Sequence, residues 1–466
     1  MLTREEEKRK ILMTILRRSR AAAGFPLVLW CLALASAPGL SARAAFAAEP
    51  AAPSAASEVE VFVAEALEKN PELAAARRQA DSASARVAPA GALPDPMLSV
   101  NYENDGVSPS LGVEPMTRLS FMAQQALPFP GKLALAEKVA SLDAGRAATR
   151  PERVALTLEA FVRRAYADLL EAREDLRLVG EQIATWRDIE EDIRVRYSAG
   201  MGTQQDVLRA QGERTRLLQQ RRRDEAVEKS AVSALNQLLF RPAQSPLPTK
   251  KELIPGALPG IPAGYKLLEE ALKATPELKD AALAKDRAKL AADLARRNLK
   301  PDFVASAAYM NRGGLPLMWS LGVGVSIPLW AGKKQRPLIV EAEALGEAAS
   351  ATEASLRRQV EARTEERLIR LEQIADEAKL DAEGVLVQDR LSVDAALASY
   401  RTGSVPFVTV LEALGTYFID RRAAVSRLAG FIRAEADLRE LSLDRAGPAA
   451  MASSPSPSFS ATASRM

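Results

Sequence analysis

The side chains that carry most enzymatic and transition-metal chemistry are nearly absent from this sequence. Its 466 residues contain no histidine and a single cysteine, Cys31. Without these groups a chain has no imidazole general base, no thiolate nucleophile and no thiolate metal ligand. The sequence also shows no paired catalytic motif, no phosphate-binding glycine loop and no metal-ligand cluster. We therefore expect no enzyme, no metal site and no cofactor.

The remaining charged groups nearly balance. The chain has 63 Lys and Arg against 60 Asp and Glu, a formal net charge of +3, and the positive excess lies in the first 47 residues. Nothing in the rest of the chain indicates a nucleic-acid surface.

Residues 1–47 have the pattern of an export signal. Basic residues precede an apolar run from Phe25 to Leu40, and small residues follow at Ala42-Arg43-Ala44 or Ala45-Phe46-Ala47 as cleavage sites. Translation can begin at Met1 or at Met13. A retained membrane anchor is the alternative, although the apolar run is short for a spanning helix. The cysteine lies within this run, so the mature chain would contain none.

Much of the remaining chain shows an internal sequence repeat. Five anchors recur in the same order at nearly constant offset, including Pro71-Glu72-Leu73 with Pro276-Glu277-Leu278, and Leu127-Pro128 with Ile327-Pro328. This pattern predicts two structural repeats, residues 58–240 and 264–446. Residues 241–263 form a Pro-rich linker between them, and residues 447–466, rich in Ser, Pro and Ala, are expected to be a disordered tail.

The spacing of apolar residues predicts two very long helices. Leu158, Val162, Ala165, Leu169 and Ala172 begin a heptad seam. A helix from about Lys132 to Ser198 would be roughly 100 Å long, and the second copy would run from about Lys333 to Tyr400. Glycine then lets the chain reverse direction after each long helix, at tips near residues 197–206 and 400–410. Such lengths favour a coiled coil or a helical tube.

Short segments with a period of two predict one β-hairpin in each repeat, at about residues 95–129 and 302–330. The clearest runs from Trp319 to Trp330, where bulky apolar residues alternate with Ser and Gly. Leu315 to Gly332 also lacks charge over 18 residues, which is long enough for a membrane helix, but its Pro and Gly residues favour strand.

A strand with one bulky apolar face and one face of Ser and Gly suits a barrel wall between lipid and water. Trp319, Trp330 and Phe129 would mark the membrane interfaces. Four strands cannot close a barrel, because open edges would leave unpaired backbone groups in lipid. Three copies would give twelve strands. The expected fold is mainly α with a small membrane β part.

The order helix, hairpin, long helix, Gly turn and return helix, repeated behind a signal peptide, resembles the TolC-like outer membrane efflux protein family. The resemblance covers about residues 58–446 and includes the runs Gln125–Lys132 and Tyr197–Gly200 with Asp206-Val207-Leu208. The first run is most similar to the heavy-metal efflux branch. The resemblance implies a homotrimer with a 12-stranded β-barrel in outer membrane lipid, continuous with a periplasmic α-helical barrel. It also implies docking on a periplasmic adaptor protein and an inner-membrane pump.

The resemblance also implies roles for residues at the two tips. The tips would contact the adaptor through Gly200, Gly202, Gly403 and Val405. The family's two constricting aspartates align with Thr409 and Glu412, so Glu412 would form a ring of three carboxylates that attracts cations. Its alternative is an ordinary solvated helix face. The gate latch would join Tyr400 and Asp206, and Arg401 could replace the family's arginine, which aligns with Val405.

The leading interpretation is a passive exit duct of a tripartite efflux or secretion system. One alternative is a structural, envelope-spanning coiled-coil protein without a pore, and another is the exit duct of type I protein secretion. The sequence leaves the cargo open among metal ions, drugs and polypeptides.

Overall fold

The computed structural model describes residues 55–249, residue 253 and residues 264–440. The expected signal at 1–47, the choice between Met1 and Met13, most of the second half of the linker and the tail at 447–466 lie outside the described residues.

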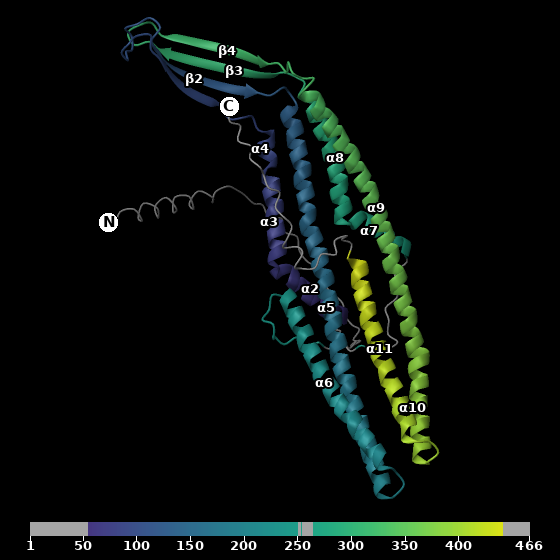
Figure 1. Cartoon of the computed structure of the whole chain (residues 1–466). Coiled ribbons are helices and arrows are strands. Elements are labelled where there is room, and N and C mark those ends of the chain that lie inside the picture. The colour runs from purple at the N-terminus through teal and green to yellow at the C-terminus, as the bar shows by residue number, and fades with distance from the viewer. Residues whose placement is uncertain (1–54, 250–252, 254–263, 441–466) are drawn as a thin grey trace, which may run out of the picture. The chain divides into compact units, whose positions relative to one another are not determined.

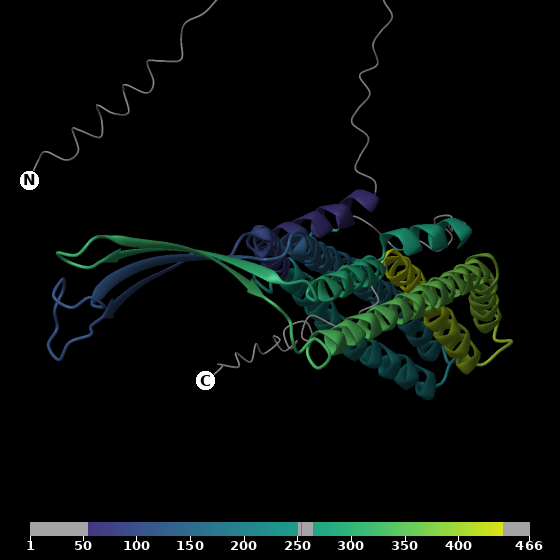
Figure 2. The ribbon, with the colours of Figure 1, turned by 90° about the horizontal axis from the view of Figure 1, so that it is seen from above.

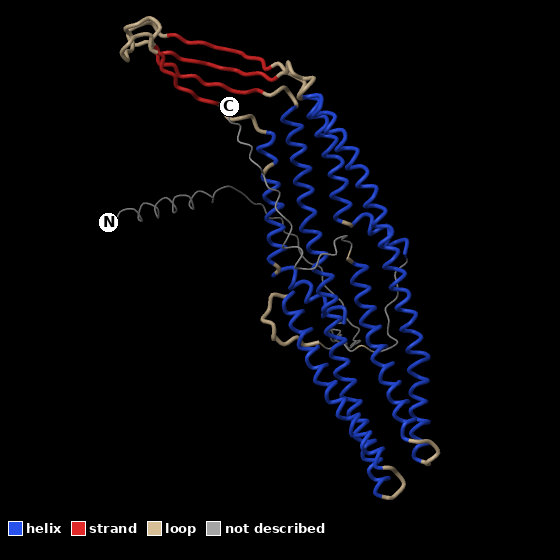
Figure 3. The backbone as a smooth tube through the Cα atoms, viewed as in Figure 1, coloured by secondary structure: helices blue, strands red, loops and turns tan. Residues whose placement is uncertain are grey.

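The same order of elements occurs in each half of the chain (Figures 1 and 3). The first half contains α2 (Ala55–Lys69), α3 (Pro71–Ala85), α4 (Val87–Gly91), β1 (Met97–Glu103), β2 (Arg118–Leu127), α5 (Lys132–Ser198) and α6 (Gln204–Leu238). The second half contains α7 (Gly264–Ala274), α8 (Pro276–Arg297), β3 (Asp302–Asn311), β4 (Met318–Ser326), α9 (Gln335–Leu380), the π-helix η1 (Asp381–Val385), α10 (Leu386–Arg401) and α11 (Phe407–Arg439).

The first long helix, α5, has the bounds expected for it, about Lys132 to Ser198, and contains 67 residues. Its counterpart differs from the expectation of one regular helix. It begins at Gln335 and ends at Arg401, and the π-helical turn η1 separates α9 from α10. Asp381, at the start of that turn, is buried and receives a bidentate ion pair from Arg427 of α11. A π-turn carries a wider hydrogen-bond pattern, and here an interhelical ion pair fixes its position.

The four strands form one antiparallel sheet in the order β1-β2-β3-β4, so β2 pairs with β3 and joins the two hairpins. The expected strands were too long at their ends. β2 ends at Leu127 and β4 at Ser326, before Pro128 and Pro328, because proline cannot donate a hydrogen bond to the ladder. The helical alternative for residues 315–332 is wrong, since β4 occupies their centre. Across the described residues, no helix combines the length and apolar character needed to cross a membrane.

The register separates the sheet into two chemically different faces. Directly paired residues share a face, and one face carries rows of apolar side chains across the strands: Val100-Phe121-Tyr309-Trp319, Leu98-Ala123-Ala307-Leu321 and Leu127-Phe303-Val325. The opposite face carries Ser99-Met122-Ala308-Ser320 and Gln124-Ser306-Gly322. The apolar face is solvent-exposed in the single chain, with Trp319, Leu321 and Val323 each more than 70% exposed.

The long helix α5 is the centre of the helical part. It packs against α3, α4 and α6, and also against α8 and α11, which both contact α9 (Figure 1). A main apolar core joins Leu169 and Leu178 of α5 with Leu235 of α6, and Leu247 and Leu253 of the linker pack into it. Both views show the sheet continuing beyond the helix ends from which its strands emerge (Figure 2).

A half-buried polar junction connects the sheet to the helices. Lys132, whose side chain is 10% exposed, donates from Nζ to Oδ1 of Asp302 at 2.7 Å and to the Lys300 carbonyl at 3.0 Å. The same carboxylate oxygen accepts the Phe129 N–H at 2.7 Å. The turn that enters α5 therefore binds directly to the turn that enters β3. Gly131, at φ 86°, supplies the left-handed backbone of that turn.

We expect Lys132→Met to lower the free energy of unfolding by about 1 to 3 kcal/mol, because it leaves the Asp302 carboxylate without its ammonium donor. The midpoint of thermal unfolding, followed by circular dichroism, measures the change. Lys138→Met, on an exposed position of the same helix, is the control. Equal midpoints for the two variants would show that the junction contributes no stability.

Candidate functional site

The two helical hairpins, α5–α6 and α10–α11, end in turns of the same design. Gly200 and Gly403 have φ of 73° and 78°. At each turn the glycine N–H donates a hydrogen bond to the carbonyl three residues earlier. The N–H of the next residue donates to the carbonyl five residues earlier, Met201 to Arg196 and Ser404 to Ser399, both at 2.9 Å. This pair of hydrogen bonds is the Schellman motif, which needs one residue in the left-handed backbone conformation and hence favours glycine.

A compact apolar cluster holds the two hairpins together just behind these turns. Trp186 and Ile193 of α5 pack with Ala210 of α6 and with Tyr400 and Phe407 of the second hairpin. The Trp186 and Phe407 rings meet edge to face at 6.2 Å, and Tyr400 lies 5.7 Å from Phe407. Because all four helices contribute, separating the hairpins would expose this cluster to water.

Polar contacts cross between the hairpins at the same level. Arg401 reaches Asp192 of α5 at 3.3 Å, and Arg196 donates to the Arg401 carbonyl at 2.8 Å. The Arg196 guanidinium also lies 4.8 Å from the centre of the Tyr400 ring. These contacts place Arg401 in a bridging position between the two hairpins.

Tyr400 is buried, and its hydroxyl has no hydrogen-bond partner among the described residues. Burial raises the pKa of Tyr400, and the negative charge of Asp206 raises it further. Asp206 is half-buried at the start of α6, where its N–H is capped by Thr203. The two residues therefore lie near one another without the direct bond that the latch would need.

The other predicted tip residues lie on one stretch of chain or at the turns. Glu412 is exposed on α11, whereas Thr409 is half-buried one turn earlier. Val405 packs at the edge of the apolar tip cluster. Gly200 and Gly403 are exposed, and Gly202 is half-buried.

The residues predicted at the membrane interfaces lie at strand ends. Trp319 is near the start of β4 and 73% exposed, and Trp330 follows β4 and is 76% exposed. Phe129 is half-buried in the turn between β2 and α5.

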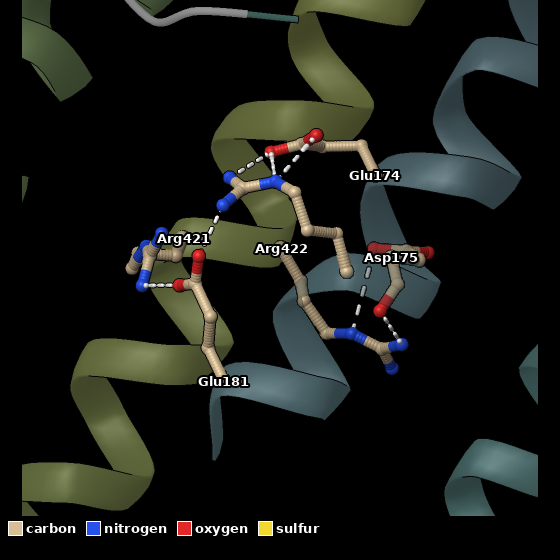
Figure 4. A network of polar contacts seen from close by, with 6 residues as sticks. Glu174, Asp175, Glu181, Arg421 and Arg422 are labelled. Atoms are coloured by element: carbon tan, nitrogen blue, oxygen red, sulfur yellow. Dashed lines mark hydrogen bonds and ion pairs between the residues drawn. The ribbon is translucent and has the colours of Figure 1, made fainter. Parts of the chain in front are cut away.

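Further from the tips, two consecutive arginines of α11 hold the second hairpin against the first (Figure 4). Arg421 binds Glu181 of α5 at 2.9 Å. Arg422 lies 3.4 Å from Asp175 of α5 and forms a short contact with Asp224 of α6. One guanidinium thus joins carboxylates from two helices of the other hairpin. We call these five residues the arginine clamp.

The clamp continues as a row of ion pairs along α11 and α5. Arg433 pairs with Asp168 at 2.6 Å and with Glu171, and Arg164 pairs with Asp437 at 2.6 Å. Sequence analysis missed this row because its partners lie more than 200 positions apart. The available signal was an arginine-rich return helix opposite an acidic stretch of the other repeat.

Within the arginine clamp, Asp175 is the carboxylate whose ionised form is most disfavoured by burial. Burial raises the pKa of Asp175 to about 6, and the nearby Arg422 offsets this effect only in part. Among the described residues, no group of three or more metal-ligating side chains is arranged to hold an ion. The site can therefore hold two hairpins together by apolar and ionic contacts. The ionic contact of Asp175 changes near pH 6, where this carboxylate gains or loses its proton.

Asp175→Asn is expected to remove a pH dependence of stability between about pH 4 and 6. The pKa of about 6 in the folded chain lies above the ordinary value of 3.8, so the folded chain binds this proton more tightly than the unfolded chain. The wild type should therefore become more stable as pH falls through 6, by on the order of 1 to 2 kcal/mol after allowance for solvent screening.

Thermal midpoints between pH 4 and 8 measure this effect. Asp188→Asn on the same helix is the control, because the Asp188 side chain is 76% exposed. An identical pH slope in wild type and Asp175→Asn would contradict the raised pKa.

Comparisons with solved structures show the fold. A membrane protein from Pseudomonas aeruginosa matches with a TM-score of 0.69 and 19% identity, over 82% of this chain and 93% of that one. CusC matches with a TM-score of 0.70 and 17% identity, over 83% and 92%. The outer membrane protein VceC from Vibrio cholerae matches with a TM-score of 0.68 and 18% identity, over 83% and 96%. No curated protein matches the chain in sequence.

The sequence model of one protein family matches both halves of the chain, over residues 62–240 and 267–442. That family is described as outer membrane efflux protein, and membership implies an outer membrane channel with a periplasmic portion. The resemblance noted in the sequence is thus confirmed: the chain belongs to the outer membrane efflux protein family.

Proposed function

We propose that three copies of this chain form the exit duct of a tripartite efflux or secretion system, with no catalytic step and no cofactor. The observation that carries the proposal is the four-stranded sheet with one exposed apolar face and two unpaired edges. An exposed row such as Phe121, Tyr309 and Trp319 is costly in water and favourable in lipid.

The open edges explain why the proposal requires several copies. Among the described strands, β1 and β4 each pair on one side alone. In a bilayer each unpaired backbone group costs several kcal/mol, so the edges must pair with other chains. Pairing β1 of one copy with β4 of the next, three times around, gives a closed barrel of twelve strands.

The helical part would continue this barrel into the periplasm. The chain passes from β2 into α5 and from β4 into α9, so barrel and helices would share one axis in a closed ring. The turns around Gly200 and Gly403 would then form the far end, where an adaptor protein docks and brings an inner-membrane pump to the entrance.

Closure of the entrance would depend on the contacts between the hairpins. The tip cluster, the Arg401–Asp192 bridge and the arginine clamp all keep α10 and α11 against α5 and α6. The partnerless Tyr400 hydroxyl and the nearby Asp206 would complete the latch in the assembled, closed ring. Opening would move the second hairpin away from the first.

The alternative of a structural coiled coil without a pore accounts for the helices but not for the sheet. If the hairpins merely packed on the helices, the apolar face would be covered by them. It is instead exposed in the single chain. The cargo would be chosen by the pump, so a metal-ion, drug or type I polypeptide system can each use such a duct.

The proposal predicts that purified full-length protein runs as a trimer that dissociates on heating, and that it conducts ions in planar bilayers. Arg421→Gln combined with Arg422→Gln should raise the single-channel conductance, because the three ion pairs of the arginine clamp are removed. Arg439→Gln, which changes an exposed i,i+4 pair on the same helix, is the control.

A stable monomer without conductance would overturn the duct itself. If the trimer conducts but the double variant and the control have the same conductance, the duct proposal stands. The arginine clamp then has no part in closing the entrance.

Glu412 supports a separate prediction about selectivity. It is exposed on α11 near the tip, and three-fold symmetry would bring three such carboxylates around one axis. Glu412→Gln should then reduce the preference for cations, since the ring loses its negative charge. The reversal potential in a salt gradient measures this preference, and Glu347→Gln, exposed on α9, is the matched control. An unchanged reversal potential would show that Glu412 does not set the selectivity and is an ordinary residue on a solvated helix face.

A further inference from the structure

A cavity lies where α11 ends between α5 and α9. Its volume is about 410 Å³, and α5, α9 and α11 supply its lining. Four of the lining residues are arginines: Arg164 of α5 and Arg363, Arg367 and Arg370 of α9. Three are acidic: Glu366, Asp437 and Glu440. The lining therefore carries one more positive than negative side chain.

The acidic residues are mostly occupied by one arginine. Arg164 binds Asp437 at 2.6 Å and makes a short contact with the carboxylate of Glu440. It also lies over the Phe161 ring, 5.3 Å from its centre. Burial raises the pKa of Glu440, which shows that its carboxylate is poorly solvated and depends on this pairing. Arg164 therefore uses two of the three negative charges.

Two arginines of α9, Arg367 and Arg370, have little compensation from nearby carboxylates. Positions 363, 367 and 370 are spaced four and three residues apart, so their side chains share one helix face and repel each other. The Arg367 side chain is 16% exposed, and its nearest carboxylate, on Glu440, is 3.8 Å away. Burial lowers the pKa of Arg367, and the charges of Arg363 and Arg164 oppose the favourable effect of Glu440. Within the described part of the chain, Arg370 makes no hydrogen bond or ion pair.

A purely structural role accounts for part of this arrangement. Arg367 donates to the Glu440 carbonyl at the end of α11, where positive charge also complements the helix dipole. Arg164 fixes the same end through Asp437. Among the described residues, Arg370 caps no carbonyl and pairs with no carboxylate, yet it lines the same cavity. The helix end therefore accounts for Arg164 and Arg367 but not for Arg370.

We propose that this cavity is a binding site for a small oxyanion of the phosphate type, held by Arg367 and Arg370 with Arg363 beside them. Guanidinium groups present N–H donors in a planar fork that matches phosphate oxygens, and such charge-assisted bonds are short and strong. The volume is in the range of small-molecule sites. A bound dianion would also relieve the repulsion among the three arginines of α9.

The test is isothermal titration of the purified full-length protein with inorganic phosphate at constant ionic strength. We expect saturable binding with one site per chain. Arg370→Gln should weaken it by at least about tenfold, the factor expected for the loss of one charge-assisted hydrogen bond. Arg370 is exposed, so this change should not impair folding. Arg358→Gln, an exposed arginine of α9 paired with Glu361, is the matched control and should bind as wild type.

A second measurement uses the thermal midpoint. Phosphate should raise the midpoint of the wild type and of Arg358→Gln, whereas chloride at equal ionic strength should not. The site is overturned if titration shows no saturable binding, if chloride acts as phosphate does, or if Arg370→Gln and Arg358→Gln bind equally. Because binding is measured without conductance, a failure of the duct proposal would leave this result interpretable.

Discussion

The pairing of β2 with β3 is the constraint on which the rest of the structure depends. These strands are about 175 positions apart in sequence, yet nine residue pairs join them. Their pairing turns two hairpins into one sheet, and α8, which leads into β3, packs beside α5, which follows β2. The half-buried Lys132–Asp302 contact reinforces this arrangement at the point where sheet and helices meet. Loss of that pairing would leave two short hairpins, each too small to keep a distinct face.

The features that follow local rules could be predicted from the sequence. Alternation along Trp319 to Ser326 predicted the correct apolar face, and the heptad seam predicted one long helix where α5 lies, since each pattern depends on residues a few positions apart. Strand ends were misjudged where proline removes a ladder donor. The π-turn and the arginine clamp could not be predicted, because they depend on Arg427 and Arg422 meeting partners in other segments.

The contacts between the two hairpins are of two kinds, and they are separated along the helices. Near the tips the contacts are apolar and aromatic, around Trp186 and Phe407. Further away they are ionic, and Asp175 makes them sensitive to protons near pH 6. Salt and pH therefore act mainly on the ionic region, whereas temperature acts strongly on the apolar cluster. Among the predicted tip residues, those whose contacts lie within one chain can be placed, whereas the proposed role of Glu412 depends on the three-fold symmetry of the proposed trimer.

The π-turn between α9 and α10 determines how this long helix tolerates a change in length. A π-turn holds about one residue more than an α-turn, so side chains beyond it are displaced by roughly 100° around the axis. Loss of one residue here would restore a regular α-turn and leave every later position of α10 facing its present neighbours, because the extra residue and the wider turn would disappear together. Loss of one residue from a regular α-helical stretch would instead turn all later positions by roughly 100°. Residues 381–385 are accordingly the place where the rod can lose a residue without exchanging the neighbours of α10.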